Sequence, residues 1–167
     1  MTEASALAAQ LRASGLVRAG QTVCAYVPIG AEPGGEALVG TLSELGATVL
    51  LPVTVSGAPL DWAPFAGTDG LVAAGYGLRE PSGPRLGAPA IGGADVIFIP
   101  ALAVDRTGTR LGRGAGYYDR SLGLARPGIP LVAVLRDAEF VAELPAQPHD
   151  VPVSHVLTPE RGLIHLG

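Results

Sequence analysis

Residues 95–120 read DVIFIPALAVDRTGTRLGRGAGYYDR, and this stretch decides the predicted fold. Its first part, Asp95 to Pro100, is a short apolar run, rich in β-branched residues and ended by proline. Such a run is typical of a strand buried on both faces of a parallel sheet. We expect a loop over Ala101 to Gly108 and a helix over Tyr117 to Leu124. A strand, a glycine-rich loop and a helix in this order place the loop near the carboxyl end of a strand, where open α/β sheets bind ligands.

The segment Arg110 to Arg120 combines glycines, arginines, tyrosines and one carboxylate. Glycine lacks a Cβ, so backbone N–H groups there can approach an anion closely. Guanidinium groups match phosphate oxygens two at a time, and Asp119 offers an oxygen to a magnesium ion that bridges phosphates. A solvated surface turn is the alternative that the segment alone leaves open. It is neither a Walker A loop, since Gly-Lys-Ser/Thr is missing, nor a dinucleotide fingerprint, since its glycine spacing differs.

Length and composition predict a single domain. The chain has 167 residues, of which 48% are hydrophobic, enough to bury one core and too few for two comfortable domains. Short apolar runs alternate with amphipathic stretches. This alternation predicts a three-layer α/β fold, an open and mainly parallel sheet with helices on both faces. The glycine-rich phosphate loop is expected at the carboxyl end of a central strand.

Charge and cysteine content exclude several functions. The net charge is −4 without a basic run, so nucleic acid is not an expected partner. All 11 basic residues are arginine, so no lysine can act as a nucleophile. Cys24, the single cysteine, lies in an expected strand and predicts a buried, inert thiol. Because neither a signal peptide nor a membrane-spanning run is visible, we expect a cytoplasmic protein without a membrane partner.

The remaining elements are predicted from periodicity and turn residues. Helices are expected at Thr2 to Ser14, Glu36 to Leu45 and Asp137 to Leu144. Strands are expected at Thr22 to Pro28, Thr48 to Val53, Leu60 to Phe65 (antiparallel or edge), Pro130 to Leu135 and Ser154 to Thr158 (central). Loops are expected at Ile29 to Gly35, which carries Glu32, and at Gly67 to Gly93, with short extended pieces.

In this context the chain resembles the 5-formyltetrahydrofolate cyclo-ligase family, also called methenyltetrahydrofolate synthetase. The matching segments run in family order over nearly the whole chain: the first strand with its Glu32 loop, Tyr76 to Pro81, Pro100 to Asp105, Gly108 to Arg120, Leu144 to Asp150 and Ser154 to Thr158. The resemblance implies ATP- and magnesium-dependent conversion of 5-formyltetrahydrofolate into 5,10-methenyltetrahydrofolate, with release of ADP and phosphate. It also implies a phosphorylated formyl intermediate, whose formation needs positioning and charge stabilisation from the protein.

The resemblance further implies the site residues. The ATP-binding loop corresponds to Arg110, Leu111, Gly112, Arg113, Gly114, Ala115, Gly116, Tyr117 and Tyr118. Of these, Arg113 to Tyr117 also face the formyl end of the folate, and Arg113 and Tyr117 are the implied catalytic residues. Folate contacts are completed by Val27, Glu32 and Tyr76, and the magnesium carboxylates correspond to Asp119 and Asp150.

Several of these residues have a plain structural alternative. Taken alone, Glu32 is an ordinary solvated loop glutamate, and Asp150 is a turn carboxylate or helix cap. His149 is expected to be a surface histidine, and Asp105 is expected to shape its loop rather than bind a ligand. Trp62 is expected to pack in the core.

The family usually begins with one more helix, rich in lysine and arginine, that reaches the ATP phosphates. We expect the single domain over residues 1–167 to lack this helix, because its first helix supplies only Arg12, followed by Arg18 in the linker. This departure leaves open a non-catalytic folate- or nucleotide-binding relative of the same family. Sugar-phosphate isomerases and CoA transferases share similar architectures, but neither Glu32 nor Glu80 has a distinctive setting for CoA transfer. We expect a monomer with small-molecule ligands.

Overall fold

The computed structural model describes residues 2–35, 37–75, 77–112, 114, 116–148 and 150–167. The helices are α1 (Glu3–Ser14), α2 (Ala37–Glu44) and α3 (Tyr117–Leu122), with 3₁₀ turns η1 (Thr68–Gly70), η2 (Ala88–Gly93) and η3 (Asp137–Glu139). The strands are β1 (Thr22–Cys24), β2 (Thr48–Val53), β3 (Asp61–Pro64), β4 (Leu71–Ala74), β5 (Leu78–Pro81), β6 (Val96–Ile99), β7 (Ala103–Asp105), β8 (Arg110–Leu111), β9 (Leu131–Val134), β10 (Phe140–Val141), β11 (His155–Thr158) and β12 (Gly162–His165). Within these ranges, no helix has the length and apolar character needed to cross a membrane.

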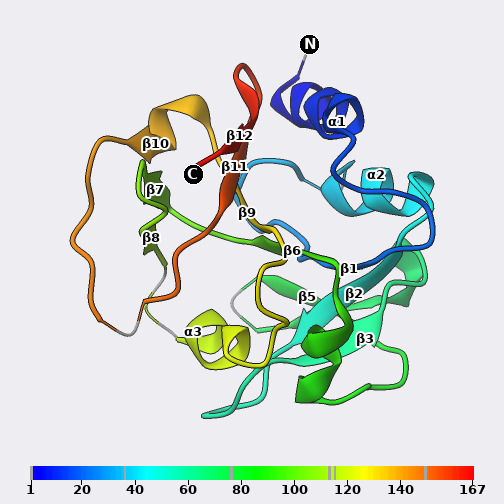
Figure 1. Ribbon diagram of the computed structural model, residues 1–167. Helices are drawn as coiled ribbons and strands as arrows, with labels where there is room; N and C mark the ends of the chain where they lie inside the picture. The colour runs from blue at the N-terminus through cyan, green and yellow to red at the C-terminus, as the bar shows by residue number, and fades with distance from the viewer. Residues whose placement is uncertain (1, 36, 76, 113, 115, 149) are drawn as a thin grey trace.

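The central sheet is mainly parallel, as predicted. Over the described residues its seven strands follow the order β12-β11-β9-β6-β1-β2-β3 (Figure 1). The inner strands pair in parallel, whereas β12 and β3 pair antiparallel at the two edges. All four residues of β6 are buried, because this strand lies in the middle of the sheet and both of its faces are covered.

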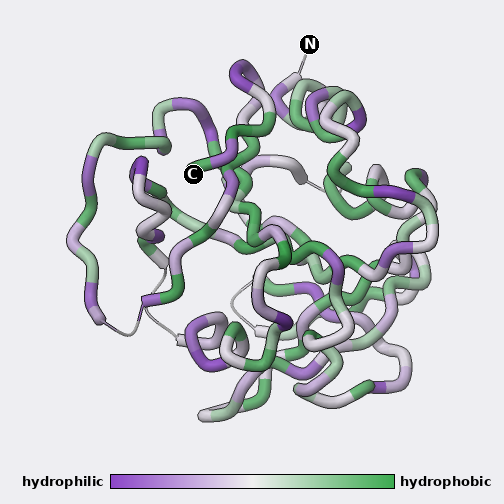
Figure 2. The backbone as a smooth tube through the Cα atoms, in the orientation of Figure 1, coloured by the Kyte–Doolittle hydropathy of each residue, from purple (hydrophilic) through white to green (hydrophobic). Residues whose placement is uncertain are grey.

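Helices cover both faces of this sheet, which confirms the three-layer α/β fold. Successive strand residues point to opposite faces, so Val23 and Cys24 belong to different layers of the core. Val23 packs in the cluster that contains Leu42 of α2. Cys24 packs in the cluster that contains Leu122 of α3 and the fully buried Trp62. The apolar backbone segments in Figure 2 gather along these central strands.

The predictions for Cys24 and for the first helix are confirmed in detail. Burial raises the pKa of Cys24 to about 12, so the thiol stays protonated and inert at neutral pH. Helix α1 begins after Thr2, whose hydroxyl accepts a hydrogen bond from the Ser5 N–H at 3.0 Å. It ends at Gly15, whose φ of 69° favours glycine.

Two local predictions were wrong. The expected loop from Ala101 to Gly108 contains β7, which joins β8 and β10 in a small second sheet. Residues Asp137 to Leu144 form η3 and β10 rather than a helix. Ser154 to Thr158 holds β11, an inner strand of the sheet as predicted, and the edge strand β12 that follows it was not predicted. In the two wrong cases, the deciding contact is with a strand too short to show a period in the sequence.

Candidate functional site

Arg110 begins β8, and its side chain points back toward the carboxyl end of β6. Its Nη1 donates to the carbonyl oxygen of Pro100, the residue after β6, at 3.3 Å. Its Nη2 donates to Oδ1 of Asp119 in α3, also at 3.3 Å. The side chain is only 10% exposed. Gly112 leaves room for it, because a Cβ at that position would lie 2.8 Å from Nη1.

Tyr118 lies beside this buried guanidinium group, whose central carbon is 5.9 Å from the centroid of the tyrosine ring. Burial raises the pKa of Tyr118, and Cys24 and Glu32 raise it further against the opposing charge of Arg110. The phenol is therefore protonated at neutral pH. Among the described residues, the buried Tyr118 hydroxyl and the buried Nε of Arg110 have no hydrogen-bond partner. The same is true of Nε1 of Trp62. Buried donors without partners are rare, and a ligand with acceptor oxygens would satisfy this pair.

The glycine-rich segment exposes its backbone next to these two side chains. Gly114 has a φ of 90°, and a Cβ there would meet nothing within 4 Å. Gly116, with a φ of 76°, is the residue before α3. Tyr117 stacks under Arg120, whose guanidinium carbon is 5.1 Å from the ring centroid. Leu111 is exposed, while the predicted site residues Arg113 and Ala115 lie outside the described residues.

The two predicted metal carboxylates lie in segments that meet at the small sheet. Asp119 is paired with Arg110. Asp150 accepts a hydrogen bond from the Gln147 N–H at 2.7 Å. One of its oxygens therefore stabilises a turn, which agrees with the alternative that Asp150 is a turn carboxylate. The segment that carries Asp150 is joined to the β7–β8 hairpin by the Val153 N–H, which donates to the Gly108 carbonyl oxygen at 2.9 Å. His149 lies outside the described residues.

The Asp119 and Asp150 carboxylates can be compared with the ligands that magnesium usually has in proteins. In the described part of the chain, no three His, Cys, Asp or Glu residues form a metal-binding group. Magnesium at phosphate sites takes one or two protein carboxylates, with phosphate oxygens and waters completing the shell. Asp119 and Asp150 each carry a carboxylate, the ligand type that this partial role needs.

Asp105 shapes its loop, as predicted. It is buried, and its carboxylate accepts hydrogen bonds from Thr107, Thr109 and the Leu144 N–H at 2.7–3.0 Å. Burial acts to raise the pKa of Asp105, but these donors outweigh it and lower the pKa. Through these hydrogen bonds the Asp105 carboxylate joins the β7–β8 hairpin to Leu144, in the chain after β10.

The predicted folate side begins where β1 ends. Val27 is buried, and Glu32 in the following loop accepts a hydrogen bond from the Ile29 N–H at 2.7 Å. Tyr26, which the sequence analysis missed, is also buried there. Burial raises the pKa of Tyr26, and the charges of Glu32, Tyr118 and Glu139 raise it further. The Tyr26 phenol therefore stays protonated at neutral pH.

Two further residues concern the folate side, Tyr76 and Arg136. Tyr76 lies outside the described residues. Arg136, at the end of β9, reaches the Glu32 loop by donating to the Ala31 carbonyl oxygen. No sequence pattern marked Tyr26 or Arg136, although Tyr26 lies near the end of one predicted strand and Arg136 directly follows another, where ligands of α/β sheets lie.

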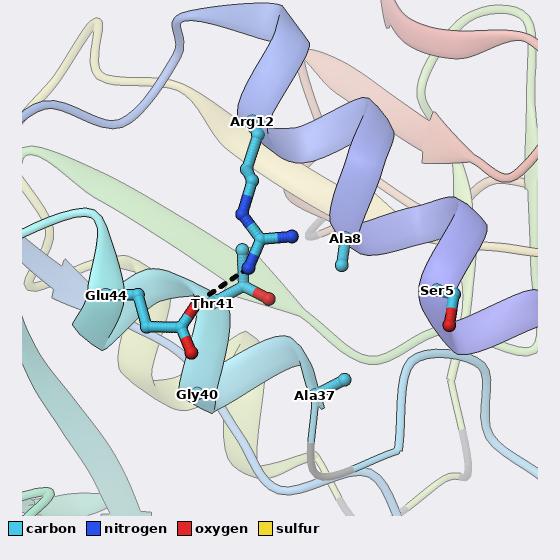
Figure 3. A pocket seen from close by; sticks show the side chains of 7 residues that line it. All are labelled: Ser5, Ala8, Arg12, Ala37, Gly40, Thr41 and Glu44. Atoms are coloured by element: carbon cyan, nitrogen blue, oxygen red, sulfur yellow. Dashed lines mark hydrogen bonds and ion pairs between the residues drawn. The ribbon is translucent and has the colours of Figure 1, made fainter.

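A separate groove lies between α1 and α2 and has a volume of about 280 Å³ (Figure 3). Its lining residues are Ser5, Ala8, Arg12, Ala37, Gly40, Thr41 and Glu44. Nη2 of Arg12 donates to Oε2 of Glu44 at 2.6 Å across the groove. None of the predicted site residues that the structure describes lines it.

The fold is that of an open α/β protein, and its candidate site lies at the carboxyl edge of the parallel strands, where such folds bind ligands. Residues 1–159 match the model of the 5-formyltetrahydrofolate cyclo-ligase family. The chain belongs to the 5-formyltetrahydrofolate cyclo-ligase family, which confirms the resemblance found in the sequence.

Individual relatives agree with this membership. A 5-formyltetrahydrofolate cyclo-ligase of Mycolicibacterium smegmatis is 57% identical over 170 residues, covering 98% of this chain and 86% of that protein. The structure of 5,10-methenyltetrahydrofolate synthetase from Aquifex aeolicus superposes with a TM-score of 0.75 at 25% identity, covering 98% of this chain and 80% of that one. The synthetase from Mycoplasma pneumoniae, at 18% identity, supports the fold with a TM-score of 0.69 over 92% and 82% of the two chains.

Proposed function

We propose that this chain converts 5-formyltetrahydrofolate into 5,10-methenyltetrahydrofolate in a reaction that consumes ATP, needs magnesium and releases ADP and phosphate. Family membership and the 57% identity to the mycobacterial cyclo-ligase support the folate conversion. The observation that carries the ATP dependence is the buried Arg110, with its Nε and the neighbouring Tyr118 hydroxyl unpartnered within the described residues. Phosphate oxygens would supply both missing acceptors.

The proposed chemistry begins at the formyl oxygen, which is a poor leaving group until it is phosphorylated. The γ-phosphoryl group passes to this oxygen, and its bond to ADP breaks. The folate's other nitrogen then attacks the formyl carbon and gives up its proton to water, and the oxygen departs with the phosphate. The protein's task is positioning and charge stabilisation.

Named residues can share this task. Arg110 and Arg113 would neutralise charge on the phosphoryl oxygens, and Tyr117 would donate to the formyl or phosphate oxygen. Backbone N–H groups from Leu111 to Tyr118 would surround the phosphates. When bound, magnesium supplies further charge neutralisation, and Asp119 and Asp150 would hold it.

The folate would lie on the opposite side of the same edge. The Glu32 carboxylate is a natural partner for the adjacent N–H donors of a pterin ring. Val27 would provide apolar contact and Tyr76 a stacking surface. The formyl end would then reach the backbone between Gly114 and Gly116, at the phosphate side. We also propose that the protein acts as a cytoplasmic monomer with small-molecule ligands.

The test is the near-ultraviolet absorbance of the methenyl product after purified protein is mixed with 5-formyltetrahydrofolate. We expect absorbance to rise only when ATP and magnesium are both present, with one ADP formed per product. A rise without ATP would overturn the nucleotide dependence. Calorimetric binding of 5-formyltetrahydrofolate without any rise would instead identify a non-catalytic relative.

A further inference from the structure

Arg136 joins three segments that are far apart in the sequence. Nε and Nη2 of Arg136 donate to the two carboxylate oxygens of Glu3 in α1, at 2.7 and 3.0 Å. Its backbone N–H donates to Oε1 of Glu139 at 2.7 Å. Nη2 also donates to the carbonyl oxygen of Ala31, next to Glu32 in the loop after β1.

The Ala31 loop needs such an external contact because its own sequence leaves it pliable. Gly30, Gly34 and Gly35 all have positive φ, and glycine has the largest backbone freedom to lose on ordering. Within the loop, the Glu32 N–H donates to the Ile29 carbonyl oxygen at 2.9 Å. The Ile29 N–H donates to the Glu32 carboxylate at 2.7 Å. These local bonds close a turn within the loop, and the contact from Arg136 ties that turn to the end of a strand.

The contact from Arg136 does fix the turn, because this residue follows a central strand. Glu3 occupies two donors of the guanidinium fork and holds it in place. With Glu3 and Glu139 beside it, at 2.7 and 3.7 Å, the charge of Arg136 is balanced within the protein. This pairing suits a support residue better than an anion-binding one.

We infer that Arg136 is a positioning residue for the folate site: by holding the Ala31 carbonyl, it sets the place of the Glu32 carboxylate. The inference rests on the proposed function, in which Glu32 binds the pterin. Arg136 itself need not touch the substrate. Lysine cannot replace it fully, because a single ammonium group cannot span Glu3 and Ala31 in the same planar geometry.

The first test compares Arg136→Met and Arg136→Lys with Arg12→Met. Arg12 is the matched control, since it also joins α1 to another element by an ion pair with a glutamate, here Glu44 of α2, and lines none of the proposed site. We expect Arg136→Met to raise the Kd for 5-formyltetrahydrofolate on the order of tenfold, as for loss of a charged hydrogen bond. Arg136→Lys should give a smaller rise, and Arg12→Met none. The Kd for ATP should stay unchanged in all three.

The double variant Glu32→Ala/Arg136→Met separates positioning from direct contact. If Arg136 acts through Glu32, the double variant binds folate no more weakly than Glu32→Ala alone. Multiplied losses in the double variant would overturn the inference, as would an unchanged folate Kd in Arg136→Met. If Glu32→Ala itself binds folate normally, the proposed role of Glu32 fails instead.

Amide hydrogen exchange of the ligand-free protein tests the loop contact directly, independently of catalysis. Amide hydrogen exchange of Ile29 and Glu32 should become faster in Arg136→Met and stay unchanged in Arg12→Met. Equal exchange rates in Arg136→Met and the parent protein would show that Arg136 does not hold the loop, and would overturn the inference whatever the activity.

Discussion

The Arg110 side chain reaches the end of β6 and Arg136 follows the neighbouring strand β9, but the surroundings of the two arginines differ. Arg136 is half-exposed, binds both carboxylate oxygens of Glu3 and holds the Ala31 carbonyl. Arg110 is buried, has one 3.3 Å contact to Asp119, and keeps its Nε without a partner within the described residues. An arginine whose hydrogen bonds are made inside the protein serves structure. One that is buried with donors unused is prepared for a ligand.

The difference predicts that substitution of Arg110 lowers activity more than stability, whereas substitution of Arg136 lowers stability and folate affinity. Arg110→Met is the variant with the largest expected effect. We expect kcat/KM to fall on the order of 10²–10³-fold, because a charge that stabilises the phosphoryl group is lost. The free energy of unfolding should change by less than about 1 kcal/mol, since an incompletely satisfied buried charge is replaced by an apolar chain of similar length. Absorbance kinetics and urea unfolding measure both quantities.

A large loss of stability in Arg110→Met would break the comparison, because it would give Arg110 the structural role assigned to Arg136. In the counterpart Arg136→Met, we expect the free energy of unfolding to fall by about 1 kcal/mol. The Kd for folate should rise, and the Kd for ATP should stay unchanged.

Gly108→Ala tests whether the Arg110 side depends on its junction with the Asp150 segment. Gly108 has a φ of 89°, and a Cβ there would lie 2.3 Å from the Val153 carbonyl oxygen. We expect a loss of about 2–4 kcal/mol in unfolding free energy from backbone strain and this clash. Gly128→Ala is the control, with a φ of 81° and nothing within 4 Å of its Cβ. Thermal unfolding that shifts equally in both variants would contradict the clash.

Tyr118→Phe sharpens the comparison at a single hydroxyl. The hydroxyl is buried without a partner in the described part of the chain, so its removal should leave the unfolding free energy unchanged or slightly higher. If this hydroxyl donates to a phosphate, the Kd for ATP should rise about tenfold. Calorimetric titration with ATP and magnesium measures the change, and an unchanged Kd would remove Tyr118 from the phosphate site.

The smallest effect is expected far from either arginine, where His155 and His165 stack across β11 and β12 with ring centroids 4.5 Å apart. Burial lowers the pKa of His155 below its ordinary 6.5, and the charge of His165 lowers it further. The unfolded chain thus takes up this proton at higher pH than the folded chain. Stability should be complete above about pH 6.5 and decline slightly as pH falls through that value.

His155→Gln should flatten this decline in urea unfolding followed between pH 7.5 and pH 5.5, ranges set by the ordinary histidine pKa of about 6.5. The folate Kd at fixed pH should be the same in parent and variant, because this pair belongs to neither side of the site. A decline that persists in the variant would assign the proton uptake to another group.

The sequence predicted the parts of the fold that depend on local pattern. The apolar run of β6, the exact span Thr48 to Val53 of β2 and the end of α1 at Ser14 all follow from side chains near in sequence. The family resemblance also named Arg110, Tyr118, Asp119 and Glu32 as site residues, and their roles stay predictions. The structure adds that Tyr118 and Asp119 both contact the buried Arg110 guanidinium group.

Other features depend on contacts that no local pattern records. The strands β7, β8 and β10 are two or three residues long, so only their pairing with one another makes them strands. Tyr26 and Arg136 gain their significance from Glu32 and Ala31, which lie on a different segment from Arg136. The sequence by itself therefore determined the chemistry available and the order of the main strands and helices. Only the tertiary structure decided which arginine is satisfied and which is not, because burial and hydrogen-bond partners come from residues distant in the chain.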